Sequence, residues 1–189
     1  VDDNSPDGTQ EIVKEYNNKY PNINLLLRPK KEGLGAAYIH GINYAMNERK
    51  ADVIFQMDGD LSHNPNLIPA FLEQTKDYDL IIGSRYIIGG GFENWSLKRK
   101  LISRGANTYG RLVLGINIKD ITSGYRCYKK ELLQKIDWDD FDNKGYSFLE
   151  ELLYYCIKNG AKTNEIPLVF VDRKIGETKI NKKEMKNFI

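Results

Sequence analysis

The chain contains little cysteine and histidine, two residues of each among 189, and it has no long apolar run. Cys127 and Cys156 lie far apart in the sequence, without the close spacing of metal-ligand motifs. They fit reduced thiols in a cytosolic setting at least as well as a disulfide. No stretch approaches the roughly 20 apolar residues that a bilayer-spanning helix requires. His40 is expected to pack on a helix and His63 to belong to a turn, so no catalytic histidine is evident.

The chain also lacks a strong excess of charge of either sign. Its net charge of +2 gives no case for a nucleic-acid-binding protein. A hydrophobic fraction of 41% without repeats or linkers predicts one globular domain over residues 1–189. Because the chain starts at Val1, within what reads as the end of a strand, we expect a fragment truncated at the N-terminus. Truncation at the C-terminus stays open.

Strand and helix signals alternate along most of the chain. Short apolar runs predict strands at residues 23–27, 53–57, 79–83 and 168–171. Apolar residues at helical spacing predict helices after Thr9, from Gly33, after Pro65, from Ser96 through Val113, and over residues 147–158. Strands that alternate with helices over short connections favour an α/β fold, with a mostly parallel sheet flanked by helices.

The central motif is the run V-I-F-Q-M-D-G-D-L-S-H-N-P over residues 53–65. A buried strand there would deliver Asp58 and Asp60 to its carboxyl edge, where open α/β sheets bind ligands. Neighbouring carboxylates repel each other unless a cation lies between them, and hard oxygen ligands suit Mg²⁺ or Mn²⁺ with a bound phosphate. An isolated Asp-x-Asp is more commonly only a polar turn, so the rest of the chain has to decide.

The helix that begins at Ser96 carries a second candidate site. Arg99 and Ser103 are four residues apart and therefore share one face, where they could grip a phosphate. The alternative is a solvated cationic face together with Lys98, Lys100 and Arg104. Three apolar residues of the helix belong either to the core, which periodicity favours, or to a lipid-facing groove: Leu97, Leu101 and Ile102. Residues 172–179 combine charge with glycine, as a flap over an anion or as plain surface.

Several sequence blocks together resemble the polyprenol-phosphate mannosyltransferases, also known as dolichyl-phosphate mannose synthases, of the family 2 glycosyltransferases. The blocks are V-D-D-N-S-P-D-G-T, G-L-G-A-A-Y-I-H-G, M-D-G-D-L-S-H-N-P, G-S-R-Y, W-S-L-K-R-K-L-I-S-R-G-A-N and F-V-D-R-K-I-G-E-T-K. They occur in the order of the family and cover nearly the whole chain, which makes the resemblance far more specific than any single motif.

The resemblance implies a GT-A fold, which is Rossmann-like, and a single catalytic domain. It implies GDP-mannose as donor, a dolichyl or polyprenyl phosphate as acceptor, Mg²⁺ or Mn²⁺ as cofactor, and inversion to a β-mannosyl phospholipid. The expected location is the cytosolic face of a membrane: the endoplasmic reticulum in a eukaryote or the cell membrane in a prokaryote. The membrane surface and small membrane-anchoring subunits are the further partners expected, and nucleic acid is not.

The metal and nucleotide residues can be carried over by position. Asp60 matches the metal-coordinating aspartate of the family, and Asp58 and Gly59 would lie against the nucleotide, with Asp58 a further metal ligand. Ser62 stands where some members carry a glutamine as a metal ligand. Asp3, with the Val1 backbone beside it, matches the nucleoside site. The family's N-terminal strand, with its Tyr-Asn-Glu contacts, has no counterpart in this chain, which would expose a sheet edge.

The phosphate-binding residues follow in the same way. Arg85, Arg99 and Ser103 match the groups that gather the donor and acceptor phosphates, with Arg85 and Arg99 joining Asp60 as catalytic residues. Arg173 and Lys179 match the segment that reaches the donor diphosphate. Three other interpretations stay open: a dolichyl-phosphate glucosyltransferase that uses UDP-glucose, a catalytically silent nucleotide-binding scaffold subunit, and a soluble sugar-nucleotide enzyme without a lipid partner.

Overall fold

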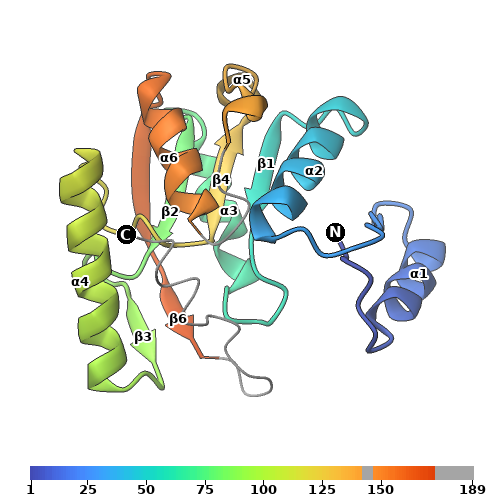
Figure 1. The fold of residues 1–189 in the computed structure, drawn as a ribbon, viewed down its shortest axis with the longest axis horizontal. Helices are drawn as coiled ribbons and strands as arrows, with labels where there is room; N and C mark the ends of the chain where they lie inside the picture. Colours follow the sequence, from blue (N-terminus) through green and yellow to red (C-terminus); the bar gives the residue numbers. More distant parts are fainter. Residues whose placement is uncertain (142–146, 173–189) are drawn as a thin grey trace.

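The computed structural model describes residues 1–141 and 147–172. A mixed sheet lies between helices, and a second, two-stranded sheet adjoins it (Figure 1). The helices are α1 Thr9–Lys19, α2 Leu34–Asn47, α3 Ile68–Gln74, α4 Leu97–Leu114, α5 Lys130–Leu133 and α6 Phe148–Lys158, with short 3-10 turns η1 Pro65–Leu67 and η2 Trp138–Asp140. The strands are β1 Val53–Gln56, β2 Leu80–Ser84, β3 Gly91–Glu93, β4 Arg126–Lys129, β5 Thr163–Pro167 and β6 Val169–Val171.

The main sheet has the strand order β1-β4-β2-β5. β2 and β5 pair in parallel, whereas β4 runs antiparallel to both of its neighbours, so β1, β2 and β5 share one direction. The predicted α/β class is confirmed. The sheet is less parallel than predicted, because two of its three strand pairings involve the antiparallel β4, whose direction the alternation of strands and helices did not reveal. Its first residue, Arg126, pairs with Gln56 at the end of β1, which brings the loop before β4 to the carboxyl edge of the sheet.

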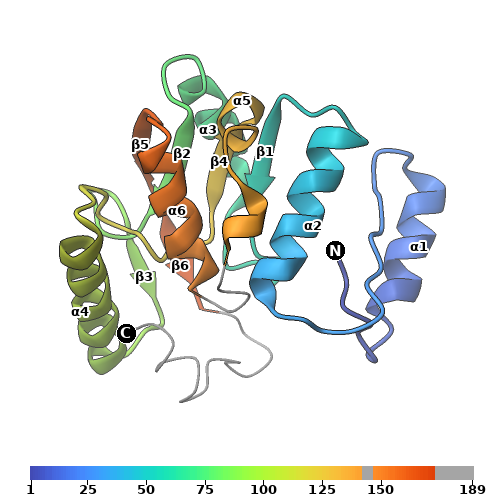
Figure 2. The ribbon, with the colours of Figure 1, turned by 45° about the horizontal axis from the view of Figure 1, so that its top comes forward.

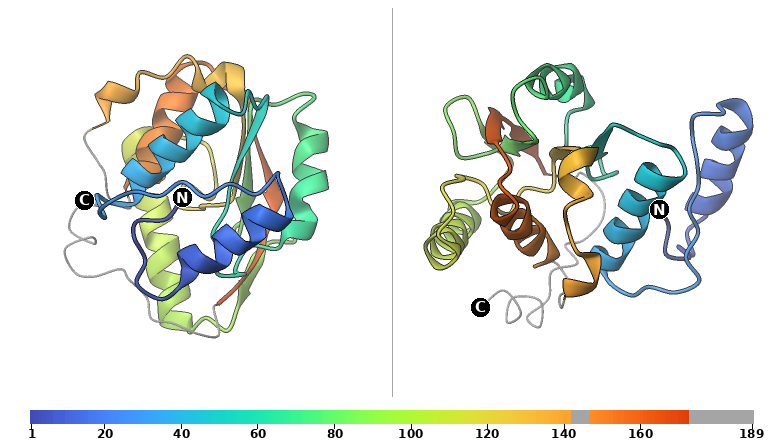
Figure 3. Two further views of the ribbon diagram at one scale, coloured as in Figure 1. Left: turned by 90° about the vertical axis from the view of Figure 1, so that its right-hand side faces the viewer. Right: turned by 90° about the horizontal axis from the view of Figure 1, so that it is seen from above.

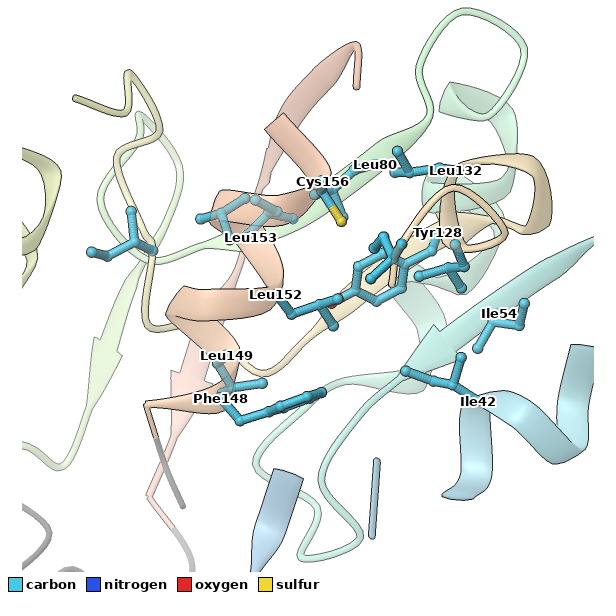
Figure 4. Close-up of a cluster of buried hydrophobic side chains, with 14 of the residues drawn as sticks. Ile42, Ile54, Leu80, Tyr128, Leu132, Phe148, Leu149, Leu152, Leu153 and Cys156 are labelled. Carbon is cyan, nitrogen blue, oxygen red and sulfur yellow. The ribbon is translucent and has the colours of Figure 1, made fainter. Parts of the chain in front are cut away.

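Helices cover both faces of this sheet. Figure 3 shows α3 on one face and α2 with α6 on the other. Strand β2 reads as an unbroken apolar run because both of its faces are buried: Leu80 and Ile82 join the α2–α6 core, and Ile81 joins the core under α3. Figure 4 shows the larger core, in which Leu152 of α6 and Ile42 of α2 lie around the ring of Tyr128.

The predicted strand at residues 23–27 is reduced to one parallel bridge between Asp2 and Leu27. The backbone N–H of Asp2 donates to the carbonyl of Leu26, and that of Arg28 donates to the carbonyl of Asp2. An apolar run becomes a strand only where neighbouring strands accept its hydrogen bonds, and here a short segment supplies just these two. Helix α1, which lies in the sequence between these two segments, has no buried residue. The prediction of a strand before Val1 stays a prediction.

Helix α4 turns its polar face inward. Asn107 is buried, and a Cβ at Gly110 would lie 2.5 Å from Cδ1 of Ile121, so the helix packs closely on the loop before β4. The preference for a core role of Leu97, Leu101 and Ile102 is wrong, because these side chains are 79%, 70% and 53% exposed. Periodicity identifies an apolar face but not what covers it. Figures 1 and 2 show α4 at the opposite end of the molecule from α1.

Candidate active site

The Asp58-Gly59-Asp60 turn follows β1 at the carboxyl edge of the sheet, as predicted. The backbone N–H of Asp58 donates a 3.0 Å hydrogen bond to Nδ1 of His63, which is 2% exposed. The imidazole stacks on Tyr125 at 4.9 Å between ring centroids. His63 therefore belongs to the turn, as expected, and fixes the first aspartate to the core.

Burial lowers the pKa of His63, although the nearby Asp58 carboxylate opposes this shift. Because Nδ1 accepts a hydrogen bond from a backbone N–H, the neutral ring carries its proton on Nε2. That atom lies 4.0 Å from Oδ2 of Asp58. One ring nitrogen of His63 thus accepts from the backbone of Asp58, and the other lies near the Asp58 carboxylate. The two contacts limit the positions that the carboxylate can adopt.

Asp60 lies at the exposed end of the same turn. Ser62 donates to its Oδ1 twice, through the backbone N–H at 3.1 Å and the hydroxyl at 2.5 Å. Leu61 between them adopts a left-handed φ of 64°, which side chains rarely favour. Ser62 is buried while Asp60 is exposed, so the serine holds the carboxylate at the surface. Its own role as a metal ligand stays a prediction.

A metal ion fits this turn by the chemistry of its oxygen donors. Residues 1–141 and 147–172 contain no group of three or more His, Cys, Asp or Glu side chains placed to hold a metal. Mg²⁺ and Mn²⁺ do not require such a cage, since Mg²⁺ commonly binds through one or two carboxylates, substrate phosphates and water. The half-exposed Asp58 and the exposed Asp60 are a pair of this kind.

Arg85 already has a buried carboxylate partner in this structure. Its Nε and Nη2 each donate a 2.7 Å hydrogen bond to Asp120, and Nη2 also donates to the hydroxyl of Thr122. Asp120 is fully buried and the Arg85 side chain is 9% exposed. Four aromatic rings lie within 6 Å of the guanidinium carbon: Tyr86, Phe92, Trp95 and Phe170. The role of Arg85 toward a phosphate stays a prediction, and its visible role is to join β2 to the loop before β4.

Helix α4 presents Arg99 and Ser103 from one face, as their spacing predicted. Ser96 caps the helix by accepting the N–H of Arg99. Nη1 of Arg99 donates a 2.5 Å hydrogen bond to Oδ2 of Asp172. Oγ of Ser103 accepts a 2.7 Å hydrogen bond from the hydroxyl of Tyr86, the residue after Arg85. The structure thus links the G-S-R-Y block to α4, and α4 to the end of β6.

The predicted nucleoside residues form a separate group beside α2. Asp3 lies 3.4 Å from Nη1 of Arg28, which also pairs with Glu32 at 2.9 Å. Val1 is exposed and approaches Gly41 of α2, where an added Cβ would lie 3.0 Å from its Cγ2. Arg28 is 5% exposed, and sequence reasoning missed it as the partner that holds Asp3. The predicted roles of Arg173 and Lys179 lie outside the described residues.

Sequence reasoning also missed the side chains that contact the candidate phosphate-binding residues Arg85, Arg99 and Ser103, or their contact partners. They are Asp120, Thr122 and Asn107 around the loop before β4, and Tyr86, Trp95 and Asp172 near α4. Asp120 and Thr122 stood in a polar loop, and Asp172 stood in a charged run that reads as surface. The sequence did not reveal that Asp120 is buried, or that Asp172 pairs with Arg99, which is distant in the sequence.

Comparison with known proteins assigns the chain to a family. The sequence profile described as Glycosyl transferase family 2 matches residues 1–137. The chain belongs to glycosyl transferase family 2. An undecaprenyl-phosphate mannosyltransferase of Micrococcus luteus is 41% identical over 181 residues, which cover 96% of this chain and 74% of the relative. A polyprenol monophosphomannose synthase of Mycolicibacterium smegmatis is 42% identical over 183 residues, covering 96% and 69% respectively.

Solved structures agree on the fold of this family 2 member. A mycobacterial protein superposes with a TM-score of 0.63 at 16% identity, over 94% of this chain and 56% of that protein. Glucosyl-3-phosphoglycerate synthase of Mycobacterium tuberculosis, solved with Mn²⁺, UDP and glucosyl-3-phosphoglycerate, gives 0.61 at 17% identity, over 100% and 63%. These likenesses concern the fold alone. The predicted GT-A fold and the resemblance to polyprenol-phosphate mannosyltransferases are confirmed.

Proposed function

We propose that the protein transfers mannose from GDP-mannose to a polyprenyl or dolichyl phosphate at the cytosolic face of a membrane. The observation that carries this proposal is the 41% and 42% identity to two mannosyltransferases named for such acceptors, each over 96% of the chain. The site supports it, because two carboxylates stand at the sheet edge, and Arg99 and Ser103 stand on α4.

Asp58 and Asp60 would hold a divalent cation. Bound there, Mg²⁺ or Mn²⁺ would offset the negative charge that develops on the departing diphosphate. Ser62 holds the carboxylate of Asp60 by two hydrogen bonds, and His63 holds the backbone of Asp58. These contacts fix the positions of the carboxylates before substrate arrives, which lowers the cost of organising the site during the reaction.

The reaction joins two anions and needs no strong base. An oxygen of the acceptor phosphate forms a bond to the anomeric carbon while the bond from that carbon to the diphosphate breaks, and the electron pair leaves with GDP. The acceptor phosphate is already ionised at neutral pH. Attack from the side opposite the leaving group would invert an α-linked donor to a β-linked product. Arg99 and Ser103 would bind the phosphate and hold it in line for this attack.

The exposed face of α4 supports a lipid partner. Besides Leu97, Leu101 and Ile102, it presents Tyr109, Leu112 and Val113, all at least 48% exposed. Lys98, Lys100 and Arg104 lie on the same helix and suit anionic headgroups. No described helix is both long and apolar enough to pass through a bilayer. We infer that α4 lies on the membrane surface, near the headgroup of the acceptor.

The experiment measures sugar transfer by the full-length protein that carries this chain. GDP-mannose and, separately, UDP-glucose would be offered with a short-chain polyprenyl phosphate, with and without a chelator. We expect mannosyl phospholipid from GDP-mannose, a loss of product with the chelator, and at least a hundredfold lower rate for Asp60→Ala, on the order of one lost charge-stabilising group. Asp77→Ala, an exposed aspartate beyond α3, is the matched control and should keep the wild-type rate.

Each other outcome has a distinct meaning. Product from UDP-glucose alone would reassign the donor and keep the site. Transfer that survives both the chelator and Asp60→Ala would contradict the metal site. A folded protein that transfers neither sugar in the presence of membrane would favour the silent scaffold.

A further inference from the structure

The ion pair between Arg99 and Asp172 joins two segments that are far apart in the sequence. Arg99 lies in the first turn of α4, and Asp172 follows β6 directly. The two side chains meet at 2.5 Å and are 42% and 28% exposed, so a dissolved or membrane-bound anion can reach the pair. The Asp172 carboxylate therefore already binds Arg99, the arginine that would bind a phosphate in the proposed function.

Arg99 does not depend on Asp172 for its placement. Its guanidinium carbon lies 3.7 Å from the centre of the Trp95 ring, a stacking distance at which an arginine is held by its flat face. Trp95 itself packs on Phe92 at 4.4 Å and on Phe170 at 5.7 Å between centroids. Removal of the Asp172 carboxylate would leave the guanidinium stacked on Trp95, and the N–H group that Asp172 accepts from would become available to another acceptor.

Ser103 is prepared to join the same anion. Its oxygen accepts the hydroxyl proton of Tyr86 at 2.7 Å, so its own proton points elsewhere and can be donated. An incoming phosphate oxygen would then find a charged donor from Arg99 and a neutral donor from Ser103. Only the donor on Arg99 is occupied by a carboxylate.

We propose that Asp172 is a resident competitor for the phosphate site, which occupies Arg99 until a phosphate-bearing ligand displaces it. This inference rests on the proposed function, in which Arg99 and Ser103 bind a phosphate. Carboxylate and phosphate oxygens compete for the same guanidinium donors, and a phosphate monoester carries close to two negative charges at neutral pH. The transfer product is a phosphodiester with one charge. Asp172 lowers the affinity for both, so the weaker-binding product leaves readily while the acceptor still binds.

The test removes the charge of Asp172 and keeps its shape. Calorimetric titrations of the full-length protein would use inorganic phosphate and, separately, a short-chain polyprenyl phosphate in detergent. For Asp172→Asn we expect Kd to fall about two- to fivefold for each ligand, as a partly exposed ion pair implies. The KM for the acceptor should fall by a similar factor, and inhibition by the product should strengthen. Asp172→Glu should stay near wild type, and Asp77→Asn controls for net charge.

A double-mutant cycle separates competition from a structural role. In the background of Arg99→Ala, Asp172→Asn should have no further effect on phosphate affinity. Unchanged or weaker phosphate binding by a folded Asp172→Asn protein would overturn the inference, as would a wild-type protein that binds neither ligand. A protein that transfers no sugar, yet gains phosphate affinity on Asp172→Asn, would refute the proposed function and leave the competitor standing.

Discussion

Burial disfavours the ionised form of the Glu150 carboxyl group, and removing its charge should stabilise the protein at pH 8. Glu150 lies in the first turn of α6, where its Oε2 is buried without a hydrogen-bond partner. Burial raises its pKa from 4.5 to about 7, against the opposing charge of Arg126. The guanidinium of Arg126 donates to the backbone carbonyls of Ser123, Leu149 and Ile121. Its effect on Glu150 is therefore the electrostatic attraction of its positive charge.

The sign of the effect follows from the two protonation states. The folded chain holds the Glu150 proton up to a pH of about 7, whereas the unfolded chain releases it near 4.5. The associated stability is fully present below pH 4.5 and is lost as the pH rises to about 7. A shift of this size corresponds to about 3 kcal/mol, at about 1.4 kcal/mol per pKa unit. Glu150→Gln cannot ionise and therefore avoids this loss.

Urea denaturation at pH 5 and at pH 8 tests this prediction. The free energy of unfolding of Glu150→Gln, minus that of wild type, should be about 2 to 3 kcal/mol larger at pH 8 than at pH 5, so the variant gains stability relative to wild type as the pH rises. Glu131→Gln, an exposed glutamate in the first turn of α5, should show no such change. If the difference between wild type and Glu150→Gln is the same at both pH values, the carboxyl is not held neutral by burial and the reasoning fails.

Two further substitutions test the packing and the outer face of α4. Gly35→Ala should destabilise the protein by about 1 to 3 kcal/mol in urea denaturation, because the added Cβ would lie 2.8 Å from Phe148; Gly105→Ala, in open space on α4, should not. The paired change Leu101→Ser and Leu112→Ser should reduce cosedimentation with anionic vesicles and leave the urea midpoint unchanged, since these side chains are 70% and 78% exposed. Ile12→Ser on α1 is the control, and vesicle binding that survives the paired change would remove α4 as the membrane contact.

Signals confined to one segment predicted that segment well. The apolar run at residues 53–57 ends at two carboxylates, and β1 delivers them to the carboxyl edge as expected. Ser96 caps α4 at the predicted residue, because a side-chain cap is a local interaction. The four-residue spacing of Arg99 and Ser103 likewise sufficed to place them on one face.

Interactions between distant segments could not be predicted from local patterns. Asp120, the partner of Arg85, lies 35 residues further along the chain, and Asp172 lies 73 residues from Arg99. A polar loop and a charged run carry no signal of which arginine they will meet. The prediction for the apolar face of α4 was wrong for a related reason. The buried residue of this helix is the polar Asn107, which hydrogen-bonds to the backbone of Ile121 and the hydroxyl of Thr122. The spacing of the apolar residues could not predict that a polar side chain would be the buried one.

The antiparallel direction of β4 explains how these distant groups reach the site. Since Arg126 at its start pairs with Gln56 at the end of β1, the preceding loop must lie at the edge that carries Asp58. From that loop, Asp120 binds Arg85, the residue that follows β2. Arg126, the first residue of β4, donates to the carbonyl of Leu149 in the first turn of α6. A parallel strand in this place would have brought its other end, and a different loop, to the carboxylates. The reversal of one strand thus brings the loop that holds Asp120 and Thr122 to the edge of the carboxylate turn, where this loop contacts both Arg85 and α4.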